Sequence, residues 1–259
     1  MNLAIELRRG LSAELFKFRR TFTLWLLILA PGFIPAINLI IFWSKGDEIM
    51  KDGGNPWNML MQFSIDPGNF LFPFFVMIVA LFVNNIEHTA NTWKLIYTQP
   101  LRRASVYLAK MQVFILMIFF SLMLFALFSV GVGYAMKVIN PELGFDQAFD
   151  KSLFFSACAK VFLCSLGYAA IQFAISQKWK NVMLPLGIGL GGFISFMILV
   201  QGWKYAPYHP YGFQILGLGG LKDPNTGLWD DLTFVWRSLI VAAAIFGLSG
   251  FDMIRKRII

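Results

Sequence analysis

The stretch EHTANTWKLIYTQPLRRASVYLAK, residues 87–110, lies between two long apolar runs, residues 70–86 and 111–136. Basic residues concentrate on the cytoplasmic side of membrane proteins, so a basic segment between two candidate spans predicts a cytoplasmic loop. A short helix is expected to begin near Glu87 and to end before Pro100, because the residue preceding a proline avoids the helical conformation. A cytoplasmic partner that moved such a polar helix would also move the two spans that flank it. The basic residues of the loop are Lys94, Arg102, Arg103 and Lys110.

The composition of the whole chain indicates a membrane protein. Of its 259 residues, 58% are hydrophobic and 14% are charged, and the mean hydropathy is +0.65. Soluble domains average about 25% charged residues. The apolar residues also fall in blocks of about 18 or more, which is the length that crosses a bilayer as a helix. We therefore expect an all-α membrane protein with no separate soluble domain.

Six apolar runs are predicted to span the membrane: residues 21–43, 70–86, 111–136, 153–176, 182–202 and 233–251. Together they form one transmembrane domain, residues 21–259, with predicted extracellular loops at residues 44–69, 137–152 and 203–232. Pro31 and Pro35 should bend the first span, because each removes a backbone hydrogen bond. Residues 57–65 are expected to form a short helix on the outer surface. The aromatic residues of the third loop are expected to anchor it at that interface or to act as a gate.

Residues 1–20 are predicted to form an amphipathic helix that lies in the membrane surface. Five apolar residues recur every three or four positions, and charged residues fill the rest. A basic amphipathic helix just ahead of a span favours this interfacial position. A signal peptide is the alternative, but the run at residues 21–43 is too long and no small-residue cleavage site closes it. The apolar stripe comprises Leu3, Leu7, Leu11, Leu15 and Phe18.

The distribution of charge predicts which side each loop occupies. Fourteen of the 22 Lys and Arg residues lie in residues 1–20, the 87–110 loop, the 177–181 turn and the C-terminal tail. Only four of the 14 acidic residues lie there. This bias predicts that both termini are cytoplasmic. It also explains the formal charge of +8 without a nucleic-acid partner, since basic residues on that side contact anionic lipid headgroups.

The 87–110 loop resembles that of the ABC-2 type of ATP-binding-cassette exporter permease. Members carry a Glu at the cytoplasmic end of the second span, then a coupling helix, a Pro, one or two basic residues, and a Lys at the start of the third span. The Asn-Thr-Trp-Lys form is most similar to permeases that protect bacteria against lantibiotics and bacitracin-like peptides, although many relatives have Gly in place of Asn91. The matching residues here are Glu87, Asn91, Thr92, Trp93, Lys94, Pro100, Arg102, Arg103 and Lys110.

The resemblance implies the ABC-2 exporter fold, with the N-terminal helix as its elbow helix, in the bacterial cytoplasmic (inner) membrane. It also implies two copies of an ATPase subunit that bind ATP and Mg²⁺, and a second permease, identical or related. The chain itself has no G-x-x-x-x-G-K-[ST] sequence, so no cofactor is expected on it. The ATPase would grip the 87–97 helix and the turn that carries Lys178 and Lys180. The expected cargo is amphipathic or lipid-like and enters sideways from the membrane, with peptide-antibiotic self-protection as the leading role.

Two other features have competing interpretations. GIGLGG, residues 187–192, matches a dinucleotide-binding pattern, but it lies inside an apolar run with no preceding strand. Gly187 and Gly191 instead form a G-x-x-x-G pair, which indicates close helix packing. Lys160 lies within the fourth predicted span. Its ammonium is expected to reach outward or to bond another helix, and the alternative is a position in the substrate or gating path.

No catalytic site is visible in the sequence. His88 and His209 are expected on opposite sides of the membrane, and Cys158 and Cys164 are expected to be core thiols. A membrane enzyme would need a set of His, Cys or carboxylate residues within the spans, and none is evident. A non-transporting membrane anchor or sensor that docks a soluble protein stays open, because it would share the basic loop.

Overall fold

The computed structural model describes residues 3–19, 21–51, 53–89, 102–221 and 227–255. Within these ranges the chain is helical and contains no strand. Four single-turn 3₁₀ segments lie in the connections, at Pro141–Leu143, Ala206–Tyr208, Pro210–Gly212 and Gly219–Leu221. The α-helices are α1 (Leu3–Phe18), α2 (Phe22–Ile49), α3 (Pro56–Thr89), α5 (Arg103–Ile139), α6 (Lys151–Lys178), α7 (Met183–Leu199), α8 (Phe213–Gly217) and α9 (Thr233–Arg255).

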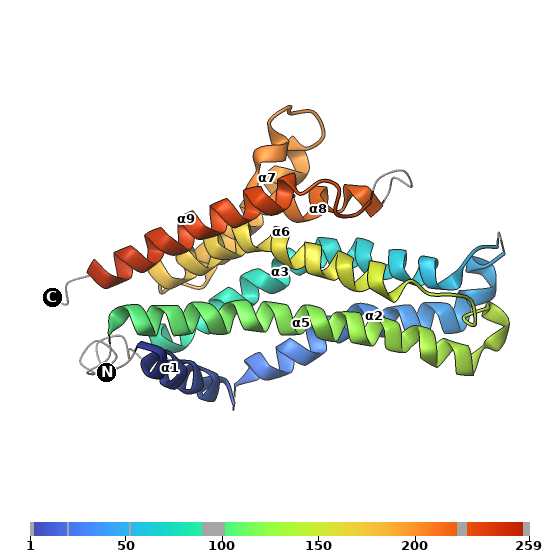
Figure 1. Ribbon diagram of the computed structural model, residues 1–259, viewed down its shortest axis with the longest axis horizontal. Helices are drawn as coiled ribbons and strands as arrows, with labels where there is room; N and C mark the ends of the chain where they lie inside the picture. The colour runs from blue at the N-terminus through green and yellow to red at the C-terminus, as the bar shows by residue number, and fades with distance from the viewer. Residues whose placement is uncertain (1–2, 20, 52, 90–101, 222–226, 256–259) are drawn as a thin grey trace.

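Five of the described helices are long and apolar enough to cross a membrane: α2, α3, α5, α6 and α9. They run along the long axis of the molecule (Figure 1). The predicted fifth span corresponds to α7, which has 17 residues. At 1.5 Å per residue α7 is about 26 Å long, slightly less than the ~30 Å hydrocarbon core of a bilayer. The all-α prediction is confirmed for the described residues, and the sixth span stays a prediction.

The predicted loop at residues 44–69 is wrong, because most of it is helical. Helix α2 continues to Ile49 and α3 already begins at Pro56, so the connection is only residues 50–55. The Oδ1 atom of Asn55 accepts the backbone N–H of Trp57 at 2.9 Å, and Pro56 supplies a fixed φ at the first helical position. The short surface helix predicted at residues 57–65 is therefore the first part of α3, which continues through Pro67 and Pro73.

Trp57 explains why α3 begins so early. Its side chain is 3% exposed, its Nε1 donates to the carbonyl of Phe145 at 3.0 Å, and its ring stacks on Phe149 at 4.3 Å. A hydrophobic cluster surrounds it at the end of the bundle opposite the C-terminal end of α3 and the start of α5. Burial of this cluster stabilises helix beyond the length that the membrane requires. Its buried members are Phe42, Trp57, Leu60, Val132, Met136, Leu143 and Phe145.

Gly133 gives this packing a direct test. A Cβ atom at Gly133 would overlap the Trp57 ring, whereas a Cβ atom at Gly131, on the same helix, would meet nothing within 4 Å. Because Trp57 is fixed by its hydrogen bond and by stacking, we expect Gly133→Ala to lower the free energy of unfolding by about 1–3 kcal/mol. Gly131→Ala should leave stability unchanged or raise it by up to ~1 kcal/mol. Thermal unfolding in detergent measures both, and equal melting temperatures would contradict this packing.

Helix α1 lies against the start of α5 at the end of the bundle where α9 finishes (Figure 1). The predicted division into an apolar face and a charged face is wrong in part. Leu15, a member of the predicted stripe, is 47% exposed, whereas Glu6 and Glu14 are 4% and 5% exposed. These two acids lie with Gly10 on the face toward α5, where Gly10 fits against Ala109. They are buried because α5 offers them polar partners.

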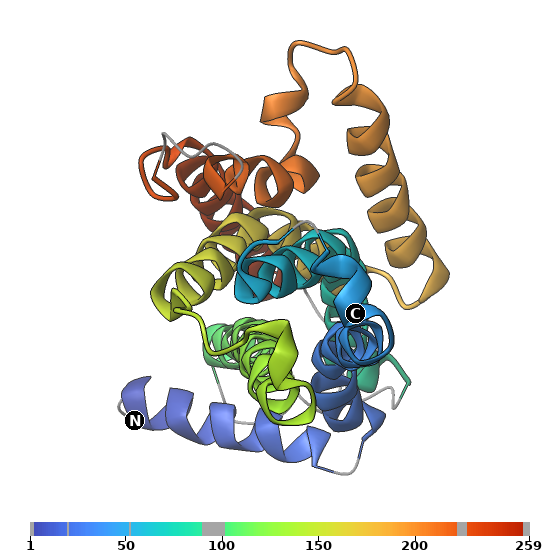
Figure 2. The same ribbon diagram turned by 90° about the vertical axis from the view of Figure 1, so that its right-hand side faces the viewer.

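Helix α7 stands at the edge of the bundle (Figure 2). The predicted packing through Gly187 and Gly191 is not found within the described chain, since a Cβ atom at either position would meet nothing within 4 Å. Gly192, on the inward face, instead receives the ring of Tyr211, whose Cε2 atom lies 2.6 Å from the position of an added Cβ. Gly212 in turn faces the ring of Phe196. Two reciprocal glycine–aromatic contacts therefore hold α7 to the loop that follows it.

The first part of that loop, residues 203–221, folds back onto the bundle. Tyr211 and Phe213 are 5% and 2% exposed, while Trp203, Tyr205 and Tyr208 are 49% to 63% exposed. The hydroxyl of Tyr211 accepts from Nε2 of Gln172 on α6. The aromatic residues of the loop thus divide into two that belong to the core, Tyr211 and Phe213, and others that are largely exposed.

Candidate functional site

The two ends of the segment that joins α3 to α5 lie together at one end of the molecule, which we call the loop end (Figure 1). Helix α3 finishes there at Thr89 and α5 begins there at Arg103. The C-terminal ends of α6 and α9 lie at the same end, where Nε2 of Gln177 contacts Sδ of Met253 at 3.0 Å. Residues 90–101, which include the predicted Asn91, Thr92, Trp93, Lys94 and Pro100, lie outside the described residues.

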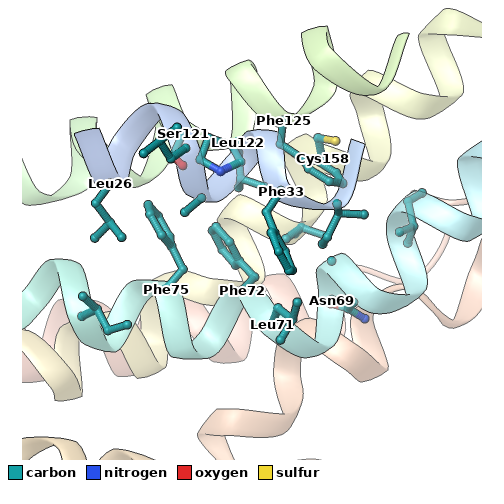
Figure 3. Close-up of a pocket in the computed structure, with 18 of the residues that line it drawn as sticks. Leu26, Phe33, Asn69, Leu71, Phe72, Phe75, Ser121, Leu122, Phe125 and Cys158 are labelled. Carbon is teal, nitrogen blue, oxygen red and sulfur yellow. The ribbon is translucent and has the colours of Figure 1, made fainter. Parts of the chain in front are cut away.

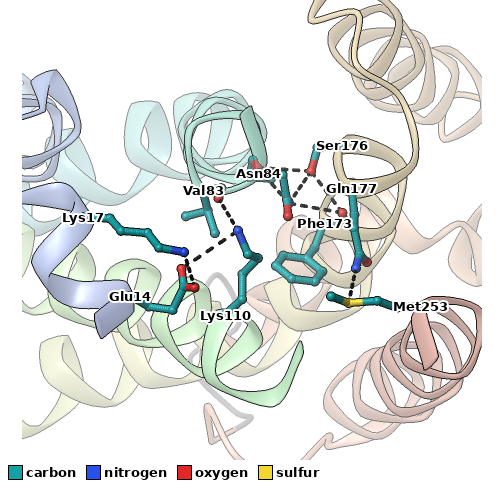
Figure 4. Close-up of polar contacts among 10 residues, drawn as sticks. Glu14, Lys17, Val83, Asn84, Lys110, Phe173, Ser176, Gln177 and Met253 are labelled. Carbon is teal, nitrogen blue, oxygen red and sulfur yellow. Dashed lines mark hydrogen bonds and ion pairs between the residues drawn. The ribbon is translucent and has the colours of Figure 1, made fainter. Parts of the chain in front are cut away.

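Lys110 is the central residue of a buried polar group at the loop end. Its side chain is fully buried, and its Nζ donates to the carbonyl of Val83 on α3 at 3.1 Å. Oε2 of Glu14 on α1 lies 3.9 Å from the same nitrogen, and Oε1 of Glu14 lies 2.5 Å from Nζ of Lys17 (Figure 4). One ammonium therefore ties α5 to both α3 and α1. The prediction that Lys110 lies on the partner-facing surface is not compatible with this burial.

A second polar group joins α3 to α6 immediately beside Lys110. Nδ2 of Asn84 donates to Oγ of Ser176 at 2.8 Å and to the carbonyl of Ala80 at 3.1 Å. The hydroxyl of Ser176 also lies 3.0 Å from the carbonyl of Phe173 (Figure 4). Both side chains are buried, so water does not compete for these bonds. We call Glu14, Val83, Asn84, Lys110 and Ser176 the loop-base cluster.

The first turn of α5 is tied to the rest of the loop end in two more places. The hydroxyl of Ser105 donates to Oε2 of Glu6 at 3.0 Å, and Nε of Arg102 lies 3.9 Å from Oε1 of the same carboxylate. Nη1 of Arg103 donates to the carbonyl of Ile254 at 3.4 Å. The N-terminal helix, the start of α5 and the end of α9 are therefore connected through polar side chains.

The loop-base cluster connects the end of α3 to the start of α5, and we call this connection the joint. The chain leaves α3 a few residues after Val83 and Asn84, and it returns into α5 a few residues before Lys110. Separation of the ends of α3 and α5 would therefore break the buried contact between Lys110 and Val83. Breaking such a contact is costly, since it leaves an uncompensated charge in a low-dielectric interior.

A family model described as ABC-2 family transporter protein matches residues 10–197. The chain belongs to this family. No curated protein matches it in a sequence comparison. The chain is thus an ABC-2 membrane protein with several membrane-spanning helices, and the proteins of this family are typically non-catalytic permease subunits that associate with an ABC ATPase.

The other predicted partner-facing residues that fall in the described part of this ABC-2 protein lie at the loop end. Arg102 and Lys178 are exposed, and Lys178 is the last residue of α6. Lys180 follows it in the exposed turn before α7. Glu87 lies in the last turns of α3 rather than at the start of a separate helix, and its side chain is outside the described part. Arg102, Lys178 and Lys180 are therefore exposed at the loop end, whereas Lys110 is buried in the loop-base cluster.

Lys160 of the ABC-2 protein lies in the first half of α6 and is 2% exposed, so its ammonium extends toward the predicted outer loop at residues 203–232 but is buried there. Its Nζ donates to the carbonyl of Leu228, and to the carbonyl of Asp231 at 2.9 Å. Its hydrogen bonds go to the loop before α9 and not to another helix. The hydroxyl and backbone N–H of Thr233 lower the pKa of the Asp231 carboxyl, so that side chain stays ionised close to Lys160. A role for Lys160 in a substrate path stays a prediction.

We expect Lys160→Met to release the loop before α9. The two carbonyl groups would lose their donor, so the free energy of unfolding should fall by about 1–3 kcal/mol. Hydrogen exchange of the backbone amides of residues 227–232 should accelerate. Lys151→Met at the exposed start of the same helix is the matched control, and its effect should stay within about 0.5 kcal/mol. Unchanged exchange together with a lower transport rate would instead favour a place for Lys160 in the path.

Several residues of the ABC-2 site were missed by sequence reasoning. Glu6 and Glu14 recur with Gly10 at intervals of four residues on one helical face, and that spacing could have indicated a buried acidic face. Asn84 lies near the end of the apolar run at residues 70–86, where hydropathy gives no sign of its buried partners. Among the described residues, no group of three His, Cys, Asp or Glu side chains could hold a metal ion, and Cys158 and Cys164 are buried free thiols.

Proposed function

We propose that the chain is the permease subunit of an ABC-2 exporter, in which a separate ATPase drives export of an amphipathic or lipid-like substrate. The observation that carries this proposal is the buried contact of Lys110 with Val83 and Glu14. It connects both ends of the loop to two long helices, so movement of the loop is converted into movement of membrane-spanning helices. A transporter driven from outside the membrane needs such a joint.

The ATPase would contact the exposed surface of the loop end. Two ATPase subunits, each with ATP and Mg²⁺, would serve a pair of permeases in the bacterial cytoplasmic membrane, and both chain ends would face the cytoplasm. Lys110 belongs to this machinery as a positioning residue that holds α3, α5 and α1 together. The proposed contact residues are Glu87, Asn91, Thr92, Trp93, Lys94, Pro100, Arg102, Arg103, Lys178 and Lys180.

A second permease, identical or related, would complete the pathway. The outward face of α7 supports this pairing, because it is apolar and carries Gly187 and Gly191 with no neighbour in the described chain. Leu184, Ile188 and Ile198 on the same face are 38% to 63% exposed. Two small residues four positions apart allow helix backbones to approach closely in a membrane. The bundle would then cross the membrane six times, with α7 as the fifth span and α1 as the elbow helix.

The apolar interior supports an amphipathic or lipid-like substrate, and self-protection against peptide antibiotics is the leading physiological role. The alternative function is a membrane anchor or sensor that docks an ATPase or another soluble partner without moving a substrate. The joint at the loop end favours transport over this alternative, since an anchor has no need to link its docking segment to the interior of several helices.

The experiment is ATP-dependent export from vesicles that contain the permease and its ATPase. We expect Trp93→Ala and Glu87→Ala to reduce export roughly tenfold or more, equivalent to at least ~1.4 kcal/mol of coupling. Trp43→Ala is the matched control, since Trp43 is 70% exposed near the far end of α2. Normal export by both loop variants, with ATPase binding retained, would disprove the coupling assignment. ATPase binding by the wild-type chain without any transported substrate would establish the anchor instead.

A further inference from the structure

An apolar cavity lies among α2, α3, α5 and α6, about halfway along these helices. Its volume is about 480 Å³. Figure 3 shows Leu26 and Phe33 of α2 on one side of this space and Phe72 and Phe75 of α3 on the other. Helix α5 forms a third wall. Helix α6 forms the fourth with Ala157, Cys158 and Val161. The lining of the cavity shares no residue with the loop-base cluster, so the cavity is a separate feature of the molecule.

The lining has almost no capacity for hydrogen bonding. The amide of Asn69 already accepts from Nε2 of Gln214 at 2.6 Å, and Cys158 offers only a weakly polar thiol. Ser121 is the remaining polar side chain in the wall. Apolar cavities of this kind stay free of water and accept apolar molecules, because a water molecule inside needs two to four polar partners. The natural occupant is therefore a hydrocarbon.

The cavity reaches the outer surface of the bundle between α2 and α3. Leu29 and Phe33 line it and are 59% and 57% exposed, and Leu71 on the facing helix is 38% exposed. Leu122 and Val161 also line it but are only 6% and 8% exposed, so they form its deep wall. In a membrane-spanning chain the exposed rim faces lipid. A hydrocarbon can therefore enter sideways without crossing a polar layer.

The dimensions of the cavity fit one hydrocarbon chain. The lining of α3 extends from Ile65 to Ile78, which corresponds to about 20 Å of helix at 1.5 Å per residue. One leaflet of the ~30 Å hydrocarbon core is about 15 Å deep, so an acyl chain has a comparable length. The volume is about three times that of the ~150 Å³ apolar cavity known to bind benzene, which corresponds to roughly 18 carbon atoms.

We propose that this cavity binds the hydrocarbon chain of one membrane amphiphile, with the polar head left outside at the rim between α2 and α3. Lipid tails are as apolar as the lining, so the hydrophobic effect does not drive the chain inward. The gain comes from van der Waals contacts that the walls of an empty cavity lack. The chain comes either from a phospholipid of the bilayer or from a single-chain amphiphile. This binding does not depend on ATP-driven export.

The test is photocrosslinking of the purified protein in lipid nanodiscs. One arm contains a phosphatidylcholine with a diazirine on an acyl chain, and the other contains a diazirine fatty acid in unlabelled lipid. Labelling is mapped by mass spectrometry at the buried Leu122 and Val161 and at Leu116 and Phe120, which are 47% and 56% exposed on α5. We expect labelled Leu122 and Val161. Labelling by phosphatidylcholine assigns the chain to a bilayer lipid, and labelling by the fatty acid alone assigns it to a single-chain amphiphile.

A variant that fills the cavity supplies the second readout. Ala30 lines the cavity, and Ala30→Phe should reduce labelling of Leu122 at least fivefold without changing labelling of Leu116. Ala244→Phe is the matched control, because Ala244 is exposed on α9 and outside the lining. Labelling confined to Leu116 and Phe120 in both arms would overturn the proposal, and so would labelling of Leu122 that Ala30→Phe leaves unchanged. The wild-type pattern decides the question even if Ala30→Phe does not fold.

Discussion

Lys110→Met is expected to lower the free energy of unfolding by about 1–3 kcal/mol, because the buried carbonyl of Val83 loses its charged donor and Glu14 loses one of its two counter-charges. Methionine keeps the length of the side chain but cannot donate to the carbonyl of Val83 or face the carboxylate of Glu14. Glu14 would keep only Lys17, which lies at the edge of the cluster. The change is measured by thermal unfolding in detergent, with the melting temperature of the wild type as reference.

A double substitution separates the charge contact from simple loss of packing. Glu14→Gln together with Lys110→Met removes both charges, so it should recover a substantial part of the stability lost by Lys110→Met alone. Lys178→Met is the matched control at the same end of the molecule, and its exposed side chain should contribute less than about 0.5 kcal/mol. If Lys110→Met and Lys178→Met had equal effects, Lys110 would not be the centre of a buried joint.

The same variant links stability to function. A joint that holds α3 and α5 together should transmit loop movement only while it is intact, so export should fall even in the fraction of Lys110→Met protein that stays folded. ATPase binding should change little, because Lys110 does not reach the surface. If the Lys110→Met protein still bound the ATPase but no longer exported substrate, its defect would lie in the transmission of movement from the ATPase-binding surface to α3 and α5.

The fold was predictable where the membrane dictates it. Apolar runs of sufficient length identified the regions that became α2, α3, α5, α6 and α9. The ends of the helices were not predictable from hydropathy, because helix continues wherever a partner buries it. Trp57 shows this, since residues that looked like a polar outer loop are the first turns of α3, packed on Phe145 and Phe149. The partners of Trp57 lie about ninety residues away in the chain.

The candidate site was predictable as a segment but not as a set of contacts. The basic residues around 87–110 identified the segment, yet sequence alone could not show which cation would be buried. Lys110 and Arg102 look alike in the sequence, and α1 places an acid beside each of them, yet only Lys110 is buried. The acids of α1 were interpreted as solvated because nothing local shows that the start of α5 covers them. Such burial is a tertiary property.

Two adjacent glycines on α7, Gly191 and Gly192, allow the stability of one permease to be tested separately from the association of two. Gly192→Leu is expected to lower the free energy of unfolding by about 3 kcal/mol or more, because the new side chain would displace the ring of Tyr211 and with it the hydrogen bond from Gln172. The loop after α7 should then come away from the bundle. Thermal unfolding and hydrogen exchange of residues 203–221 measure this loss.

Gly191→Leu points the same side chain about 100° further around the helix, where the described chain leaves open space. The single chain should therefore keep its stability, while association of two permeases should weaken roughly tenfold, or by ~1.4 kcal/mol, because the helices can no longer approach closely. Single-molecule counting of subunits in nanodiscs measures that association. If Gly191→Leu left the association unchanged, the outward face of α7 would contact lipid, and the second permease would have to pair through another surface. The two variants differ by one position, so a general effect of leucine in this helix cannot account for opposite results.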